Sequence, residues 1–474
     1  MVWAMDLQMD VGPPGEVTAS LYRQLVAAIR DGRLTPGERL PSSRELADQL
    51  QVSRGTVTAV YDRLAAEGLV ESRRGSGTYV PTHVTPSRAR CAPRGQRVAP
   101  RHVWSSLPPD VPDPTGVEFD LAGGEPDPSL FPLATWRRLM SETLRPSLIA
   151  TSPYAGTSHP ALQDAIAAYL GRSRSVVAQG DDIILSNGSQ QAFDLVARVL
   201  IAPGNRVAVE SPGYTSLVRL WSSHGARVTG VPVDDEGLVV DALPDDARVV
   251  YVTPSHQFPT GVVMSLPRRI ALLEWAAAHG AVIVEDDYDS EFRYQDRPLE
   301  PLQSLDWDGY VVYTGSFSKI LSPILRVGYL VAPASLQPAL RRAKQLTDWQ
   351  GDLATQGALA RFIADGDLAA QLRRTTRTYA ARRAALLAAL ADIDELEVVP
   401  SVAGLRIATR FRDPSVDDRA VCQALAASGV GVEPLSPRYV DGRPAPGLVV
   451  GFGRIDADRI PGAVSILAGV IRQR

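Results

Sequence analysis

The sequence contains little cysteine and no long hydrophobic run. Its 474 residues include two cysteines, Cys91 and Cys422, which are too few for a disulfide framework and lack the spacing of metal ligands, so we assign them no role and expect no metal. No apolar run reaches the roughly 18 residues that span a bilayer. Met1 to Asp10 lack the basic and apolar regions of a signal peptide. These absences predict a soluble, cytoplasmic protein with no membrane partner.

Lysine is almost absent as well. It occurs at Lys319 and Lys344, and all the other Lys and Arg positions are arginine. A primary amine can form a Schiff base with an aldehyde, whereas a guanidinium that stays protonated cannot. Lys319 is therefore a candidate for covalent chemistry. Lys344 stands beside Arg341 and Arg342, and we expect it to be a surface residue.

The chain is long enough for more than one domain, because single cores stop growing well below this length. A segment rich in proline and arginine separates two modules and has hardly any periodic apolar pattern. We expect a front domain over 1–80, a semi-stiff linker over 81–117 and a back domain over 118–474. The net charge is −4, but residues 1–105 hold 14 Arg and no Lys against 10 acidic residues, a modest basic excess.

The front module has the pattern of three short helices and a wing. Apolar residues recur at helical spacing over 21–29 and again over 57–64. Between these stretches, Ser42 and Glu45 form a capping box that opens a second helix. Ser53 is a suitable N-cap for the third helix. The segments LVESRR and TYV flank a GSG turn and predict a two-stranded wing.

Two short helices joined by a tight turn can place the second helix in a DNA major groove. The second helix of this pair is expected over 54–67, with Arg54 in the first turn, where base edges are usually met. The wing is expected to contact phosphates or the minor groove. The candidate DNA-binding residues are Ser43, Arg44, Ser53, Arg54, Thr56, Thr58, Arg73, Arg74 and Gly77. By pattern alone, a small three-helix domain with solvated arginines fits equally well.

The stretch PSSRELADQLQVSRGTVTAVYDRLAAEGLVESRRGSGTYV decides between these interpretations. It closely resembles the winged helix-turn-helix of GntR-type bacterial regulators from Pro41 to Val80, almost without a gap. The resemblance implies that DNA is a partner. It also implies that Arg44, Arg54 and Gly77 occupy positions that touch DNA.

The back module alternates short apolar strands with amphipathic helices. Examples are DIILS before QQAFDLVARVL, and ALLEWAAAHG before AVIVEDD. Such alternation predicts a large α/β domain with a mainly parallel sheet covered by helices on both faces. The chain as a whole is thus a multidomain protein with a small α+β domain and a large α/β domain. Ligands of open sheets bind at the carboxyl ends of the strands.

An aldehyde cofactor such as pyridoxal phosphate (PLP) requires a phosphate cup, a buried carboxylate near the ring nitrogen and an aromatic lid. Strand AVIVEDD delivers Asp286 or Asp287. Tyr288 follows and can reach the 3-oxygen of the ring, and Tyr214 in ESPGY can cover the ring. The candidate phosphate residues are Gly188, Ser189, Gln190, Ser316, Ser318 and Arg326. Taken singly, each feature also has an ordinary structural explanation, as a solvated turn, a helix cap or the edge of a core.

Taken together and in this order, these features resemble fold type I aminotransferases. The segments SHQFPTG, EDDYDSEF and GSFSK look like the MocR (GabR-like) family of regulators, and the resemblance spans nearly the whole chain. It implies PLP as cofactor and Lys319 as the Schiff-base lysine. Asp286 would pair with the pyridine nitrogen, because the family position lies two residues before Tyr288. The resemblance also implies that Tyr288 binds the 3-oxygen and that Tyr214 stacks on the ring. It further implies that the six candidate phosphate residues named in the previous paragraph surround the phosphate.

One departure bears on function. Phe258 stands where aminotransferases carry the asparagine of an NPTG segment, which supports the cofactor oxygen and the handling of substrate. The leading hypothesis is therefore a PLP-dependent transcriptional regulator that senses a small-molecule effector, with at most residual half-transamination. The alternative is an active aminotransferase with an appended DNA-binding module, and a third is an enzyme that uses the wing for protein contacts. We expect a homodimer on repeated half-sites, because fold type I sites are usually completed across a subunit interface.

The effector site is expected to lack the arginine that usually binds a substrate carboxylate. Aminotransferases hold the substrate carboxylate with an arginine on a late strand, but the corresponding stretch here, 448–450, is Leu-Val-Val, and a second arginine position of GABA-sensing relatives corresponds to Ser216. Arg438, Arg443 and Arg454 lie near this stretch, with a surface role as the alternative. We hypothesise that the signal is not GABA but occupancy by PLP itself, as in the vitamin B6 (PdxR-like) branch of the family.

Overall fold

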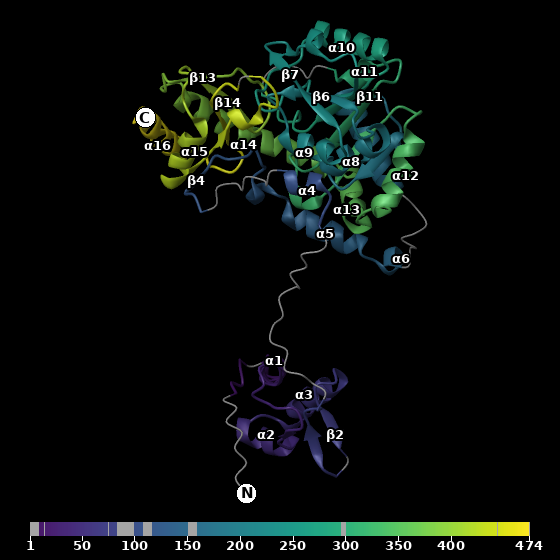
Figure 1. The fold of residues 1–474 in the computed structure, drawn as a ribbon, viewed down its shortest axis with the longest axis vertical. Helices are drawn as coiled ribbons and strands as arrows, with labels where there is room; N and C mark the ends of the chain where they lie inside the picture. The colour runs from purple at the N-terminus through teal and green to yellow at the C-terminus, as the bar shows by residue number, and fades with distance from the viewer. Residues whose placement is uncertain are drawn as a thin grey trace. The chain divides into compact units, whose positions relative to one another are not determined.

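The chain forms two compact units, one within residues 1–100 and one within 101–474 (Figure 1). Among the described residues, no helix is long and apolar enough to cross a membrane. The computed structural model describes residues 9–13, 15–73, 75–82, 99–107, 116–149, 159–294, 300–442 and 444–473.

The front unit contains the three predicted helices and a small sheet. The predicted capping box is present, since the Ser42 side chain accepts from the Glu45 amide at 3.2 Å and the Glu45 carboxylate accepts from the Ser42 amide at 2.8 Å. Ser53 caps the third helix as predicted. The apolar faces of the helices form one buried core. The elements are α1 (Val17–Arg30), β1 (Arg39–Leu40), α2 (Ser43–Leu50), α3 (Arg54–Ala66), β2 (Glu71–Arg73) and β3 (Gly77–Tyr79).

The sheet of the front unit has three strands, so the prediction of a two-stranded wing was incomplete. β1 pairs antiparallel with β3 on the side opposite β2, with Arg39 opposite Tyr79. A strand of two residues is too short to show the period-2 alternation that identifies strands in a sequence. The third strand places the Arg39 side chain next to the wing.

The back unit is built on an eight-stranded sheet with the order β5-β12-β11-β10-β9-β6-β7-β8. The five strands from β11 to β7 run parallel, as predicted, whereas β12 and β8 are antiparallel to their neighbours. The strands are β5 (Ile183–Ser186), β6 (Arg206–Ser211), β7 (Arg227–Asp234), β8 (Gly237–Leu238), β9 (Ala247–Val252), β10 (Val282–Asp287), β11 (Val311–Ser316) and β12 (Gly328–Val331).

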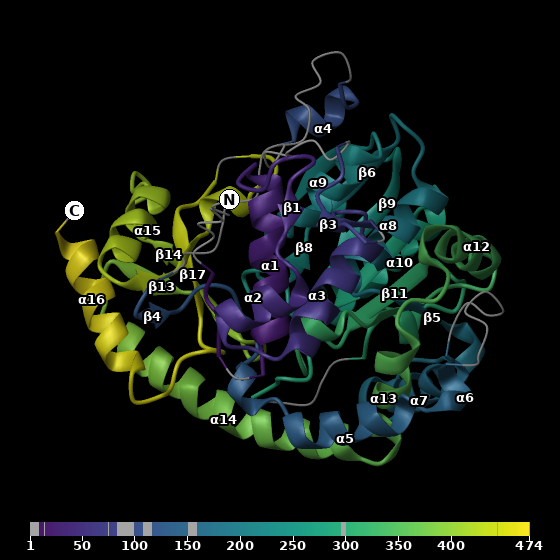
Figure 2. The same cartoon turned by 90° about the horizontal axis from the view of Figure 1, so that it is seen from below.

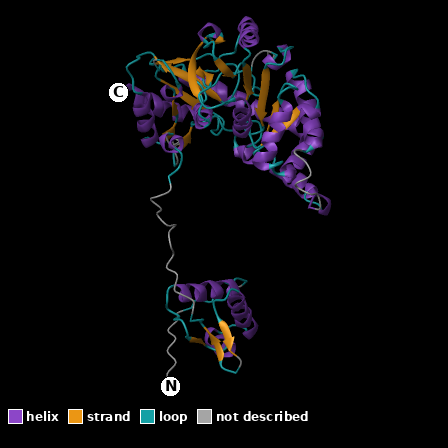
Figure 3. Cartoon of the chain, turned by 45° about the vertical axis from the view of Figure 1, so that its right-hand side comes forward, coloured by secondary structure: helices purple, strands orange, loops and turns teal. Residues whose placement is uncertain are grey.

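Helices cover both faces of this sheet, as the alternating pattern predicted (Figure 3). Alternate residues of each strand point to opposite faces. Val284 and Tyr251 belong to the core under α8 (Ser189–Leu200), α9 (Thr215–Ser223) and α12 (Gln337–Asp348). Ile283 and Val250 belong to the core under α10 (Leu266–His279) and α11 (Leu302–Leu305).

Lys344 lies on α12 and is buried, so the expectation of a surface residue was wrong. Its Nζ donates to Gln191 at 3.1 Å and to Asp348 at 2.5 Å. Asp348 also accepts from the side chain of Asn187. The charged amine is tolerated in the interior because a carboxylate one helical turn away neutralises it.

A second, smaller sheet follows in the chain, with the order β13-β14-β17-β16 and antiparallel pairing throughout. The long helix α14 packs against α16 beside it (Figure 2). The small sheet consists of β13 (Leu396–Val398), β14 (Arg406–Phe411), β16 (Glu433–Pro434) and β17 (Gly447–Gly451), and β4 (Phe119–Asp120) pairs with β15 (Val430–Gly431) in a two-stranded sheet of its own. The remaining helices are α4 (His102–Ser106), α5 (Leu133–Thr143), α6 (Pro146–Ile149), α7 (Pro160–Arg174), α13 (Leu353–Ala364), α14 (Asp367–Leu390), α15 (Asp418–Ala427) and α16 (Ile460–Arg472).

Candidate functional site

Lys319 follows the carboxyl end of β11, near the centre of the large sheet. The Nζ atom has no hydrogen bond or ion pair with any described residue, although most of the side chain is withdrawn from solvent. Burial and the nearby Arg406 guanidinium lower the pKa of Lys319 to about 8. The amine is therefore partly neutral near pH 7 and available to react with an aldehyde.

The two neighbouring carboxylates that the sequence left as alternatives have different surroundings. Asp286 accepts a hydrogen bond from Tyr251 at 2.7 Å, and no cation among the described residues pairs with it. Burial raises the pKa of Asp286 to about 7. Asp287 is paired with Arg174 at 2.8 Å and accepts from Tyr313 at 2.5 Å. Of the two carboxylates, Asp286 is therefore the one that is paired with no cation in the described part of the chain and can pair with a ligand.

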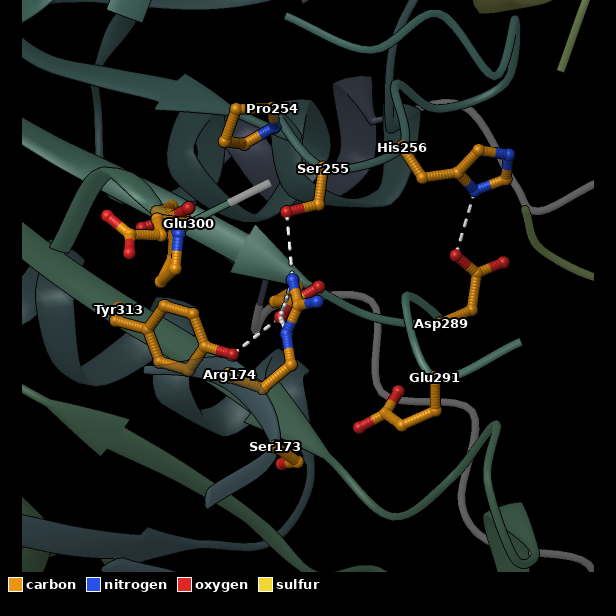
Figure 4. A network of polar contacts seen from close by, with 12 residues as sticks. Ser173, Arg174, Pro254, Ser255, His256, Asp289, Glu291, Glu300 and Tyr313 are labelled. Atoms are coloured by element: carbon orange, nitrogen blue, oxygen red, sulfur yellow. Dashed lines mark hydrogen bonds and ion pairs between the residues drawn. The ribbon is translucent and has the colours of Figure 1, made fainter. Parts of the chain in front are cut away.

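Arg174, which was not predicted from the sequence, belongs to a polar network at the carboxyl ends of β9 and β10. The last residue of α7, it donates to Asp287 and, at 3.0 Å, to Ser255 (Figure 4). Ser255 lies in the segment that leads from β9 to Phe258. The buried arginine therefore connects the carboxyl end of β10 with that of β9, and both segments carry candidate site residues.

Tyr288 is positioned by a histidine. Its Oη lies 2.9 Å from His256 Nδ1. The same nitrogen lies 2.8 Å from the Asp289 carboxylate (Figure 4). His256 Nε2 lies 3.1 Å from Ser401 Oγ. Because the carboxylate of Asp289 can only accept, Nδ1 must carry the hydrogen. Tyr288 Oη then shares this one hydrogen with Asp289 as a second acceptor, and its own proton is left for another oxygen.

Four aromatic rings contact one another in the same region. Phe258 makes an edge-to-face contact with Tyr214 at 5.8 Å between ring centres and another with Tyr288 at 6.0 Å. Phe193 of α8 contacts Tyr214 from a different direction, at 6.4 Å. Phe258 therefore replaces the amide of the aminotransferase NPTG segment by an apolar ring between the two tyrosines.

The predicted phosphate residues lie where β5 and β11 end and β12 begins. Ser186, Gly328 and Ser316 occupy adjacent register positions on these strands. Gly188 opens α8 with φ +80°, and a Cβ at this position would lie 2.9 Å from the Arg326 guanidinium. Arg326 in turn donates to the Asn187 carbonyl at 2.8 Å.

This loop is suited to an anion. It combines the N-terminus of a twelve-residue helix with no side-chain cap, a guanidinium and several hydroxyls. The Gln190 Oε1 atom is buried without a partner. The glycine at 188 leaves the backbone amides accessible. The residues present therefore fit the phosphate of a cofactor.

The arginines considered for the effector differ in placement. Arg438 is half-buried, pairs with Glu433 and donates to Thr215 at 3.2 Å. Arg454 pairs with Glu125 and Asp120, and Arg443 lies outside the described residues. Ser216 lines a cavity of about 470 Å³ together with Gln190, Tyr214 and residues of α4 and α9.

Four residues of this site were not predicted from the sequence: Arg174, Tyr251, His256 and Arg406. Tyr251 lies on β9, and His256 lies in the segment SHQFPTG, which was noted for its resemblance to the family but not for this residue. Arg174 ends a helix far away in the sequence. Arg406, on β14, lies in a segment that resembled no quoted motif, and only the fold brings its guanidinium over the Phe258 ring, 4.6 Å from the ring centre.

In the front unit, the predicted DNA-contacting residues of the two helices lie close together. Arg54 is exposed in the first turn of α3 and its Nε donates to Ser43 at 3.4 Å. Arg44 is exposed in the first turn of α2. Ser53 and Thr56 are hydrogen-bonded to each other at 2.8 Å as part of the cap of α3, and Thr58 Oγ1 donates to the Arg54 carbonyl at 3.0 Å.

The wing presents a second basic surface. Arg73 pairs with Glu71 and lies over the Tyr79 ring, 4.7 Å from its centre. Gly77 has φ +122°, and a Cβ there would lie 2.7 Å from the Arg39 guanidinium. Arg39 is exposed and was not predicted as a site residue. The predicted contact Arg74 lies outside the described residues.

Comparisons with known proteins agree with both units. A model of the family "Bacterial regulatory proteins, gntR family" matches residues 17–80, and "Aminotransferase class I and II" matches residues 121–457. The chain is 37% identical to the probable rhizopine catabolism regulatory protein MocR of Rhizobium meliloti, over 92% of this chain and 90% of that protein. It is 35% identical to the pyridoxine biosynthesis transcriptional regulator PdxR of Corynebacterium glutamicum, over 96% of each.

Solved structures agree for the back unit. The kynurenine aminotransferase of Pyrococcus horikoshii, in complex with PMP, is similar with a TM-score of 0.70 and 29% identity, over 76% of this chain and 92% of that chain. An archaeal alanine:glyoxylate aminotransferase is similar with a TM-score of 0.71 and 29% identity, over the same shares of the two chains.

A gntR-type winged helix followed by an aminotransferase-type unit defines a class of transcriptional regulator built on an enzyme fold. The chain belongs to this family of helix-turn-helix regulators, together with MocR and PdxR. The predicted fold class is thereby confirmed. The class I and II aminotransferase fold also indicates dependence on PLP.

Proposed function

We propose that the chain holds PLP on Lys319 and that the loaded back unit, with its effector, controls how the front unit binds operator DNA. The observation that carries the proposal is the unpaired, mostly withdrawn amine of Lys319 at the carboxyl end of β11, with its pKa lowered to about 8. Only the amine among the basic side chains can join an aldehyde.

The residues around Lys319 have the chemistry that such a cofactor requires. Asp286 would hold the proton on the ring nitrogen, and the Tyr251 hydroxyl keeps its carboxylate oriented. Tyr288 would donate its free proton to the 3-oxygen. Gly188, Ser189, Gln190, Ser316, Ser318 and Arg326 would hold the phosphate, and Tyr214 would cover the ring.

When bound, PLP supplies an aldehyde that takes up amines and a ring that withdraws electrons from them. The protein supplies the charges that fix the ring. Arg174 satisfies the charge of Asp287, which leaves Asp286 to face the ring nitrogen. A protonated ring nitrogen would in turn stabilise the ionised form of Asp286, whose pKa burial raises to about 7.

The front unit would read DNA through α3 and the wing. The exposed Arg54 at the start of α3 supports direct contact with a base, and Arg73 with Gly77 supports phosphate contact. We propose a homodimer on repeated half-sites, with residues 81–117 as the linker between domains 1–80 and 118–474. A stable cofactor-loaded monomer in analytical ultracentrifugation would contradict the dimer.

An active aminotransferase is the second candidate, and the near-complete set of cofactor residues favours it. Phe258 favours the regulator, because an apolar ring cannot make the hydrogen bonds of the amide it replaces. Transamination assays across amino-acid and keto-acid pairs separate the two. Sustained turnover of about 1 per second or more would establish an enzyme.

The regulatory function is tested by operator binding of the full-length chain. The operator is first selected from random-sequence DNA, and affinity is then measured by fluorescence anisotropy for the apo-protein, the PLP-loaded protein, and the loaded protein with an amino-acid panel. We expect loading or effector binding to change the operator dissociation constant about fivefold or more. Equal affinity in all three states would contradict the proposal.

A further inference from the structure

Arg406 is a buried arginine without a counter-ion. Its side chain is 6% exposed, and its Nε is buried without a hydrogen-bond partner. The structure gives this guanidinium no ion pair and no hydrogen bond among the described residues. Burial of a charged group without a partner is costly, so such groups are normally paired with a counter-ion or bind a ligand.

The acidic groups nearest to Arg406 are already engaged. Glu433 forms its ion pair with Arg438. The charge of Arg438, and after it that of Arg406, lowers the pKa of Glu433. Glu125, which lies near Lys319, forms its ion pair with Arg454. Each of the other two arginines therefore has its own carboxylate, and the charge of Arg406 remains unmatched.

Arg406 faces the candidate cofactor site. Its guanidinium carbon lies 4.6 Å from the centre of the Phe258 ring, which contacts both Tyr214 and Tyr288. Its charge also lowers the pKa of Lys319, so the two cations share one region. The Gly124 backbone packs closely against the guanidinium. A Cβ added at Gly124 would lie 2.5 Å from Arg406 Nε, so only glycine fits there.

Arg406 lies close to the position of the missing carboxylate-binding arginine. The late strand β17 carries Leu448, Val449 and Val450, the stretch where the resemblance to aminotransferases implies an arginine. β17 pairs with β14, where Ala408 is opposite Val449 and Arg406 is opposite Gly451. Residues two apart on a strand share a face. Arg406 thus belongs to the same face of the small sheet as Val449, on the neighbouring strand.

We propose that Arg406 binds the carboxylate of the effector, which is an amino acid or a closely related amino carboxylate. This inference rests on the proposed function, since the amine of such a ligand is the group that the cofactor aldehyde takes up. A guanidinium matches a carboxylate in two parallel hydrogen bonds. The phosphate has its own arginine, Arg326, at the start of α8. The effector class therefore extends beyond occupancy by PLP alone.

The test uses the full-length PLP-loaded protein and matched ligand pairs. Binding of the twenty standard L-amino acids, β-alanine and 4-aminobutyrate is followed by calorimetry and by the visible absorption of the bound cofactor. The tightest ligand is then compared with its carboxamide, which keeps the amine and loses the negative charge. The variants are Arg406→Gln and Arg406→Lys, and the control is Arg410→Gln, which removes a charge from the same strand.

We expect the unchanged protein and Arg410→Gln to bind the acid about 30-fold or more tightly than its amide. Arg406→Gln should lose this preference with little change in amide affinity, and Arg406→Lys should recover part of it. Circular dichroism and a retained cofactor band establish that Arg406→Gln is folded and loaded. If Arg406→Gln fails to fold, the acid-to-amide ratio of Arg406→Lys decides the matter, and an unchanged ratio contradicts the proposal.

Two results would overturn the inference in distinguishable ways. If loaded protein binds none of the panel, or if Arg406→Gln keeps the preference for the acid, Arg406 does not bind an effector carboxylate, and the proposed function stands. If the unchanged protein forms no visible band with PLP, the proposed function itself fails, and the inference fails with it.

Discussion

Asp286 and Asp287 are consecutive residues of β10, but their carboxylates face opposite sides of the sheet and have different partners. Asp286 accepts from Tyr251, whereas Asp287 is ion-paired with Arg174 and accepts from Tyr313. The fold thus neutralises one carboxylate internally and leaves the other to a ligand. This division of roles has a measurable consequence for stability.

Arg174→Met should destabilise the protein by about 3 to 5 kcal/mol, because it leaves the buried Asp287 carboxylate without its cation. The double variant Arg174→Met/Asp287→Asn should recover part of the loss. Arg198→Met removes an exposed ion pair with Asp194 and should cost at most about 1 kcal/mol. Urea unfolding of the PLP-loaded chain measures all three, and equal effects of Arg174→Met and Arg198→Met would contradict the assignment.

Lys319→Ala should abolish the visible absorption of bound PLP while the fold and any dimer remain intact, because one side chain and one covalent link are removed. Lys319→Arg should behave in the same way, since it restores the charge but not the reactive amine. Lys344→Arg is the matched control at the other lysine and should keep the band. A band retained in Lys319→Ala would refute the role of Lys319.

Attachment of PLP should depend on pH through Lys319. The neutral amine is the reactive form, and burial and Arg406 lower its pKa to about 8. The second-order rate of attachment to apo-protein should therefore rise with pH and level off above about 8. Arg406→Gln removes a neighbouring positive charge and should move the midpoint to higher pH. Stopped-flow absorbance measures both profiles, and a midpoint near 10.5 in the unchanged protein would contradict the lowered pKa.

Arg54→Ala should weaken binding to the selected operator by about 1 to 3 kcal/mol and have less effect on random DNA, as expected for one base contact. Arg73→Ala should weaken binding to all sequences and flatten the salt dependence. Arg63→Ala, at the other end of α3 in contact with Tyr22 and Glu67, serves as the control and should change neither. Equal losses on operator and random DNA for Arg54→Ala would exclude base readout.

Local signals in the sequence predicted most of the fold. The Ser42 capping box and the Ser53 cap were identified because a helix start depends on residues within four positions. Alternating strands and helices predicted the large sheet. The two-residue strand β1 was missed because it is stabilised only by pairing with β3, which is distant in sequence.

The site was predictable where residues lie at or just after the carboxyl end of a strand, as Asp286 and Lys319 do. Arg174 and Arg406 were not predictable, because each reaches the site from a distant element and carries no local pattern. Lys344 shows the converse error. Its arginine neighbours suggested an exposed face, but only the packing of α12 against α8 brings Gln191 beside it.

The register positions of Ser186, Gly328 and Ser316 link the start of α8 to the strand that leads to Lys319. A phosphate bound there would touch segments more than a hundred residues apart, so this site would form only with the large sheet. PLP held at this site would therefore favour the native state, and a concentration 100-fold above its dissociation constant would add about 2.7 kcal/mol to the stability. In a cell, the supply of cofactor would then set the amount of this regulator that survives proteolysis, as well as its DNA binding.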